Sequence, residues 1–370
     1  MAGVNLSGAN LSGANLNSVR LTDANLIDAN LSAARLSGAN LSAANLSGAR
    51  LSGARLSGAN LRAANLSAAN LSSVGLPYTN LTNADMTGVR LTDANLISVR
   101  LTRANLSGAN LSRARLPYAD LTNADMTDAN LISADLISAN LSGARLSGAN
   151  LSGANLNSVR LPYTDLTNAY MTGVRLTDAT LIDANLSGAN LRAANLSAAN
   201  LSGANLSGAN LSAANLSGAN LSGANLSAAN LSNTIGNGIE IITLVIPGWT
   251  VVFTDQVMAI GCEQHTIDEW REFTDEEIAG MSEHALGWWR KWKPLIFQTI
   301  ELSAGDRCVM NNIEKIDKIF HDVSELRPPE RLTSERNLAW MTKRLEAIHA
   351  LNSMSLYEAS QNGEDLEDDK

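Results

Sequence analysis

The sequence predicts a mainly β protein in which a long β-solenoid is followed by a small α+β domain. Three observations predict this fold class. An aliphatic residue occupies every fifth position from Leu6 to Leu231, which makes 46 positions without a slip in phase. A pair of mostly small, polar residues follows nearly every one of these positions. After residue 233 the pattern stops, and lysine and glutamate appear for the first time.

The period of five matches neither an α-helix, which repeats about every 3.6 residues, nor a strand, which repeats about every 2. In each unit, leucine and the alanine, valine or threonine two positions earlier flank one polar residue, which is strand alternation over three residues. The small polar pair that follows must then be a turn. A chain that turns every five residues in the same sense winds into coils, and successive coils pair through their backbones.

The apolar positions are uniform enough to form one continuous core. Only Met86, Met126 and Met171 replace leucine, and methionine is a flexible apolar residue of similar volume. Each buried leucine stabilises the fold by about 1.5–3 kcal/mol. Asparagine precedes most of the leucines, and we expect its side chain to bond neighbouring backbone and to stack in ladders.

Tandem A(N/D)LSG units such as those at 201–232 are the motif of the pentapeptide-repeat proteins, and residues 2–233 resemble that family. The resemblance implies a right-handed, four-sided (quadrilateral) β-helix in which the leucine and the residue two before it point inward. If each coil takes four units, the rod has about 11.5 coils and is about 55 Å long.

Charge and cysteine content divide the chain and indicate its compartment. Residues 1–233 hold 14 Arg and 11 Asp, a net charge of +3, whereas residues 234–370 carry −12. Two cysteines are too few for a disulfide framework and are consistent with a reducing compartment. No signal peptide is visible, and the most apolar run, 239–253, is too short to span a bilayer. We expect the protein in the cytoplasm of a host cell or in a virion, without a membrane partner.

Residues 234–357 are expected to form the α+β domain, and residues 358–370 a disordered acidic tail. Helices should begin at Thr266 and Thr274, because each is followed three positions later by glutamate in a capping box. A third should begin near Ser282, with Pro294 kinking or ending it. The predicted strands lie in 238–247, 249–253 and 256–262, and two further helices in 311–326 and 334–354.

The stretch 259–296 resembles a small domain associated with pentapeptide-repeat proteins of phages and prophages. The resemblance rests on a "GCxxHTxxEW" motif and implies a phage context without a mechanism. The motif positions, whose role is unknown, are Gly261, Cys262, His265, Thr266, Glu269 and Trp270.

Three chemical alternatives exist for this region. Cys262, His265, His284 and Cys308 are residue types of a zinc site, but their spacing fits no standard finger. Cys262 and His265 as nucleophile and base lack an evident third orienting group. The tryptophans and basic residues of 287–293 have the types that bind nucleic acid, but on an acidic domain core packing is favoured. We therefore expect no metal, no cofactor, no catalytic residue and no nucleic-acid partner.

Surface charge bears on the best-known activity of the family, which is DNA mimicry against type II topoisomerases. With 20 residues a coil, Arg35, Arg55, Arg115 and Arg175 form one column, opposite a column of aspartates about 10 Å apart. Duplex phosphates occur about every 1.7 Å of axis, so this spacing is a poor mimic. The candidate interaction residues are Asp85, Asp125, Asp165, Tyr78, Tyr118 and Tyr163.

These observations favour a non-enzymatic scaffold, phage-derived, with the rod as rigid spacer and the C-terminal domain as recognition or capping module. Only "MAGVN" precedes the first leucine, so we expect the N-terminal end of the rod to be covered by a partner or a second copy. The alternatives are a DNA-mimic inhibitor or protector of a type II topoisomerase, and a metal-binding or enzymatic C-terminal domain.

Overall fold

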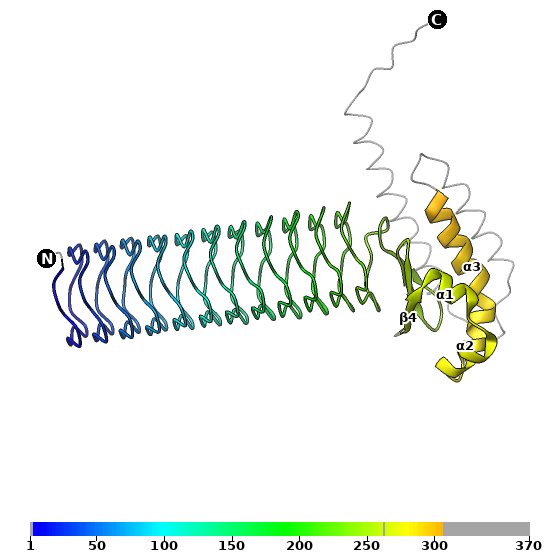
Figure 1. Ribbon diagram of the computed structural model, residues 1–370, viewed down its shortest axis with the longest axis horizontal. Coiled ribbons are helices and arrows are strands. Elements are labelled where there is room, and N and C mark those ends of the chain that lie inside the picture. Colours follow the sequence, from blue (N-terminus) through cyan, green and yellow to red (C-terminus); the bar gives the residue numbers. More distant parts are fainter. Residues whose placement is uncertain (1–2, 262, 306–370) are drawn as a thin grey trace, which may run out of the picture. The chain divides into compact units, whose positions relative to one another are not determined.

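Parallel backbone bridges link every fifth residue to the residue 20 positions later, from Asn5 to Ile235. The computed structural model describes residues 3–261 and 263–305. Each coil therefore contains four five-residue units, and the coils stack along one axis (Figure 1). Residues 3–235, termed the rod, contain no helix. The predicted β-solenoid is confirmed.

Each five-residue unit builds its own turn. The N–H of Ala9 donates to the carbonyl of Leu6 at 3.0 Å, and Gly8 between them has φ +66°. A bond between the first and fourth residues, with positive φ at the third, is the geometry of a type II turn. The third turn residue of every unit has a positive φ, which glycine, asparagine and aspartate adopt at least cost, but alanine and serine also occupy this position in several units.

The asparagines that precede the leucines hold the turns in place. Asn5 Oδ1 accepts a hydrogen bond from the N–H of Ser7 at 3.1 Å, and the same contact recurs along the rod. Some asparagines also bond to the next coil, as Asn30 Nδ2 donates to Asn10 Oδ1 at 3.2 Å. These residues therefore have the structural role that the sequence predicts.

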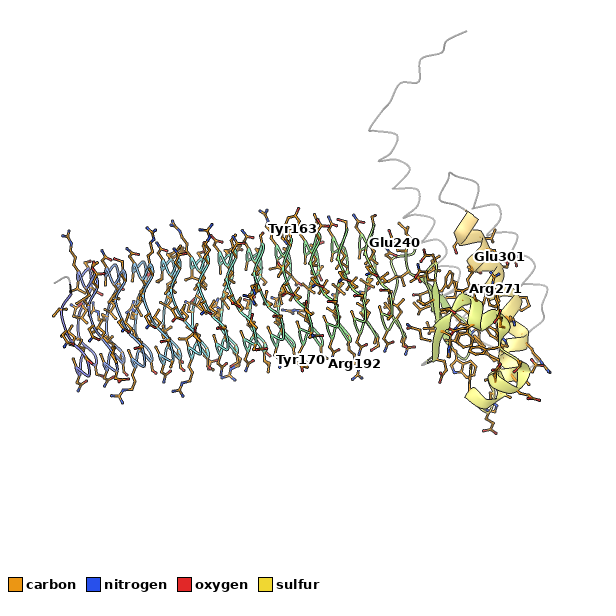
Figure 2. All side chains as sticks on the ribbon, viewed as in Figure 1. Tyr163, Tyr170, Arg192, Glu240, Arg271 and Glu301 are labelled. Atoms are coloured by element: carbon orange, nitrogen blue, oxygen red, sulfur yellow. The ribbon has the colours of Figure 1, made fainter. Side chains whose placement is uncertain are left out.

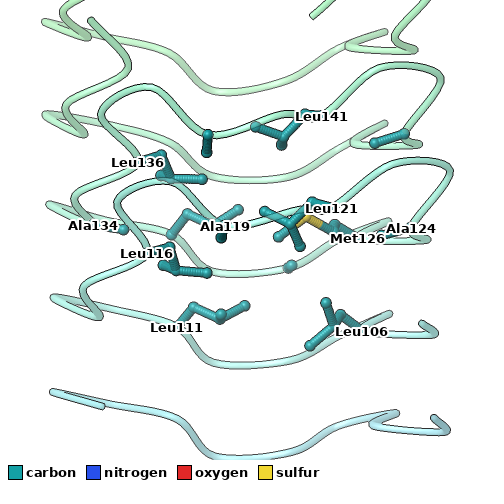
Figure 3. Packing of buried hydrophobic residues seen from close by; sticks show 14 of the residues in the cluster. Leu106, Leu111, Leu116, Ala119, Leu121, Ala124, Met126, Ala134, Leu136 and Leu141 are labelled. Carbon is teal, nitrogen blue, oxygen red and sulfur yellow. The ribbon is translucent and has the colours of Figure 1, made fainter. Parts of the chain in front are cut away.

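The inward residues fill the rod. Every fifth-position residue from Leu21 to Leu221 is at most 5% exposed, and so is the residue two before it from Ala24 to Ala219. Figure 3 shows Leu106, Leu121 and Met126 among the side chains packed between successive coils. The core is thus one continuous column of aliphatic side chains.

Three buried threonines occupy inward positions without leaving a polar group unpaired. The hydroxyl of each donates to a leucine carbonyl of an earlier coil. The pairs are Thr79 with Leu56 at 2.8 Å, Thr164 with Leu141 at 2.9 Å, and Thr234 with Leu211 at 2.8 Å.

An antiparallel sheet of four strands in sequence order follows the rod. The first three strands confirm the prediction, but the fourth was missed. Its sequence, EQHT, has no apolar alternation, and it becomes a strand by pairing with its neighbour, Met258 opposite His265. The strands are β1 (Ile242–Val245), β2 (Thr250–Phe253), β3 (Val257–Ile260) and β4 (Glu263–Thr266).

Three helices follow the sheet, and both predicted capping boxes are present, at Thr266 and Thr274. Pro294 lies inside the third helix, so the alternative that it ends this helix is wrong. A proline removes one hydrogen bond, and the residues on either side of it still form theirs. The helices are α1 (Ile267–Glu272), α2 (Asp275–Met281) and α3 (Ala285–Gly305).

The chain divides into two compact units, residues 1–292 and residues 293–370. Of the second unit, the structure describes only the last part of α3. The helices predicted over 311–326 and 334–354 and the acidic tail lie outside the described residues. No described helix has both the length and the apolar character that a bilayer crossing needs.

Side-chain amides of the first unit complete the hydrogen bonds of the last coil. Gln264 Nε2 donates to the carbonyl of Ala229 at 2.5 Å, and its Oε1 accepts from the N–H of Leu231 at 3.0 Å. One coil earlier, the peptide of Asn230 makes the equivalent pair of bonds. Ile241 and Val252 join the same buried cluster as the rod leucines. The carboxamide of Gln264 therefore replaces the peptide group that a further coil would supply.

Candidate functional site

The three candidate aspartates lie in one column of the rod, as the sequence predicts. Bridges connect Asp85 to Asp125 through Asn105, and Asp125 to Asp165 through Arg145. The guanidinium Nη1 of Arg145 lies 3.2 Å from the Asp125 carboxylate. The column is therefore interrupted by a positive charge that the sequence analysis did not take into account.

The aspartate carboxylates also have local hydrogen-bond partners. Asp125 Oδ1 accepts from the N–H and the hydroxyl of Thr127, at 3.0 and 2.7 Å. Burial raises the pKa of Asp125, but the bonds from Thr127 and the Arg145 charge outweigh it and hold the pKa below its usual range. The carboxylate is ionised at neutral pH and stabilises its own turn.

The three candidate tyrosines occupy the regular turn position of the repeat. Each follows a proline and stands at the turn position with positive φ, at 58°, 58° and 57° for Tyr78, Tyr118 and Tyr163. Their side chains are 69%, 65% and 69% exposed, so core packing does not compensate for the strain. The role of these residues as an interaction surface stays a prediction.

Only two of these tyrosines share one corner of the rod. Successive turn residues are hydrogen bonded along it: Tyr78 N–H to the carbonyl of Ile97, Ser98 to Pro117, and Tyr118 to Ile137, at 2.9–3.1 Å. The apolar residues along this edge, termed the Pro-Tyr corner, are Pro77, Tyr78, Ile97, Pro117, Tyr118 and Ile137. Tyr163 belongs to a different column, and Figure 2 shows it on the edge of the rod opposite Tyr170.

Replacing Tyr118 by asparagine should raise the thermal stability of the rod by about 0.5–1 kcal/mol, because asparagine enters the left-handed region more easily. Thermal unfolding followed by circular dichroism measures the change. The control is Tyr170→Asn, since Tyr170 is 56% exposed but lies at a bridge position without positive φ, and there no stabilisation is expected. A stability loss in Tyr118→Asn would show that the ring contributes to the fold.

The motif positions around His265 pack against one another. Gly261 has φ +63° in the turn before β4, while Cys262 lies outside the described residues. The His265 ring meets the rings of Trp270 and Phe273 edge to face, with centroids 5.3 and 4.8 Å apart. Its Nε2 lies 3.8 Å from a carboxylate oxygen of Glu263.

The remaining motif residues join β4 to α1. The N–H of Thr266 donates to Glu269 Oε2 at 2.8 Å, and the N–H of Glu269 donates to Thr266 Oγ1 at 3.2 Å. The backbone hydrogen bond from Thr266 lowers the pKa of Glu269. Buried Trp270 donates from Nε1 to the carbonyl of Met258 at 2.7 Å. These contacts are structural, and a further role for the motif stays a prediction.

The residues weighed as zinc ligands are not brought together within the described part of the chain. His284 is exposed, and Cys262 and Cys308 lie outside the described residues. Across residues 3–261 and 263–305 no group of three or more histidine, cysteine, aspartate or glutamate side chains is placed to hold a metal ion.

A cavity of about 130 Å³ lies between the β3–β4 turn, α2 and the start of α3. Four indoles line it, from Trp249, Trp270, Trp288 and Trp289, together with the Glu263 side chain. The sequence predicts core packing for the tryptophans of 287–292, and no pattern in it predicts this cavity. One feature of the sequence points to this region: all six tryptophans lie after the repeat.

Comparison with known proteins identifies the repeat. The family model described as pentapeptide repeats matches overlapping segments that together cover residues 1–233. No match was found among curated protein sequences.

Three solved structures that resemble the chain are those of HetL, QnrB1 and Rfr23. HetL, involved in heterocyst differentiation regulation in the cyanobacterium Nostoc, is 32% identical over 64% of this chain and 90% of its own, with a TM-score of 0.39. QnrB1, a plasmid-mediated fluoroquinolone resistance protein, is 22% identical over 49% and 90%, with a TM-score of 0.38. Rfr23 of a Cyanothece cyanobacterium is 41% identical over 26% and 63%, with a TM-score of 0.19.

Proposed function

Because the chain belongs to the pentapeptide-repeat family, we propose that it is a non-enzymatic scaffold for protein interaction. In this proposal the rod is a right-handed, four-sided β-helix that acts as a rigid spacer, and residues 234–357 form the recognition or capping module. One observation carries the proposal: side chains fill the rod core continuously from Leu21 to Leu221. A filled interior leaves the surface and the ends for binding.

The chemistry of the C-terminal motif supports a non-enzymatic role. Thr266 and Glu269 bond each other as a helix cap, and His265 is packed between two aromatic rings. The resemblance of 259–296 to a domain of phage and prophage proteins supports a phage-derived origin. We therefore propose a non-enzymatic role for the C-terminal motif and a phage-derived origin for the protein.

Charge makes the scaffold a better proposal than DNA mimicry. A mimic needs a continuous negative surface, whereas residues 1–233 carry a net charge of +3. The aspartate column is also interrupted by Arg145, which pairs with Asp125. A purified topoisomerase supercoiling assay should therefore show no inhibition or protection.

We further propose that the first coil is covered by a second copy or another protein. Leu6, Leu11 and Leu16 are only partly buried, whereas Leu21 is 2% exposed. Light scattering of the full chain should show self-association, and Leu6→Lys should weaken it while the C-terminal sheet stays folded. A monomer at high concentration, with slow amide exchange over residues 3–20 and no bound protein, would contradict this proposal.

Photo-crosslinking of the full chain in the extract of its own cells, followed by mass spectrometry, tests the scaffold proposal. We expect one or a few proteins crosslinked to residues 242–292 or to the Pro-Tyr corner. Crosslinks found only within a single chain, with none to another protein molecule, would contradict a role in protein interaction.

A further inference from the structure

Four tryptophans are among the residues that line the cavity beside α2, and the other apolar lining residues are Ile260, Ile278, Met281 and Ala285. Trp249 and Trp288 are half-buried and meet edge to face, with centroids 5.0 Å apart and planes at 67°. Trp270 and Trp289 are buried, with centroids 5.3 Å apart. The volume of about 130 Å³ is several times what one water molecule needs, so the cavity can hold a small organic group.

The polar atoms of two indoles are already used by the protein. Trp270 Nε1 donates to the carbonyl of Met258, and Trp288 Nε1 donates to the carbonyl of Pro247, both at 2.7 Å. These two Nε1 donors are therefore engaged within the protein, and what the two rings can add to ligand binding is their aromatic surface. The charged side chain in the lining is the carboxylate of Glu263, which also lies 3.8 Å from His265.

The charge of the residues around the cavity favours a positively charged ligand. Residues 234–292 contain 10 acidic and 3 basic residues, and this net negative charge disfavours anions. Aromatic rings attract cations through the negative face of their π-system. A bare ammonium group carries three donors that all need acceptors, and a mainly apolar wall leaves some of them unpaired. An alkylated ammonium has few or no donors and suits this wall better.

We propose that this cavity binds an alkylated ammonium head group, held by the four indoles and the Glu263 carboxylate. The inference rests on the proposed role of residues 234–357 as the recognition module. The same chemistry occurs in a methylated lysine side chain of a partner protein and in a free quaternary amine of the choline type. The size of the cavity fits a trimethylammonium group.

Tryptophan fluorescence of the full chain tests the proposal, since the rod contains no tryptophan. Choline should give a saturable change. The neutral isostere 3,3-dimethylbutan-1-ol should bind at least about fivefold more weakly, because it lacks the charge. A trimethyllysine peptide and its unmodified form separate the two sources. Tighter binding of the trimethylated peptide than of choline supports a protein partner, and the reverse supports a free amine.

Matched variants assign the site to these residues. Glu263→Gln and Trp249→Leu should each weaken choline binding at least about fivefold, whereas Glu272→Gln, an exposed acidic residue outside the cavity, should leave it unchanged. Circular dichroism confirms that each variant is folded, and Glu263→Gln keeps the shape of the side chain.

Equal binding of choline and its neutral isostere, no binding of choline, or unchanged affinity in Glu263→Gln would overturn the proposal. Crosslinking to a partner in the scaffold experiment does not depend on these results, so the two proposals fail separately.

Discussion

Replacing Leu121 by aspartate should destabilise the rod by at least about 4 kcal/mol and open the coils around the substitution. Leu121 is 0% exposed and packs between coils (Figure 3). The change removes about 1.5–3 kcal/mol of apolar burial and leaves a carboxylate without a partner in the core, which costs several kcal/mol more. Limited proteolysis and amide exchange across residues 101–141 measure the loss.

Ile132→Asp is the matched control. Ile132 is 39% exposed at a turn position of a nearby unit, and its carbonyl accepts a backbone hydrogen bond from Arg113 that the substitution keeps. We expect its stability to change by no more than about 0.5 kcal/mol. If Leu121→Asp and Ile132→Asp behave alike, the inward assignment of the fifth-position residues is wrong.

Replacing Gln264 by glutamate should detach the sheet from the last coil of the rod. The carbonyl of Ala229 then faces an anionic oxygen in place of the Nε2 donor that now lies 2.5 Å away. One lost hydrogen bond with an unsatisfied partner costs about 1–3 kcal/mol, and the repulsion between the two oxygens adds to it. Faster amide exchange in residues 219–235, together with a lower thermal midpoint, is the expected result.

Gln256→Glu carries the same change of charge at an exposed residue between β2 and β3. Its expected effect on exchange in residues 219–235 is negligible, because its side chain does not reach the rod. Equal exchange rates in the two variants would show that the Gln264 carboxamide does not act as a substitute peptide group.

The rod was predictable because its structure is local. Each five-residue unit forms its own turn, as the bond from the Ala9 N–H to the Leu6 carbonyl shows. Because the apolar positions repeat with the same period, successive coils stack them on one another. The helix caps at Thr266 and Thr274 were predictable for the same reason, since donor and acceptor lie three residues apart.

The features that the sequence analysis missed depend on distant contacts. Gln264 bonds to residues 33 and 35 positions away, and no local signal distinguishes it from other polar side chains. Arg145, by contrast, falls in the Asp125 column under the same 20-residue coil that the sequence predicts, so this pair was predictable and was overlooked. The indole cavity brings together residues from 249 to 289, which no short motif encodes.

Deleting one complete coil, residues 201–220, tests most directly whether the rod is a spacer that presents a separate recognition module. This segment contains no charged or aromatic residue, and its removal preserves the 20-residue register. The account predicts a folded chain, shortened by about 4.8 Å, that still crosslinks to the same partner as the full chain. A folded deletion variant that no longer captures the partner would contradict the account, because binding would then depend on the coil itself.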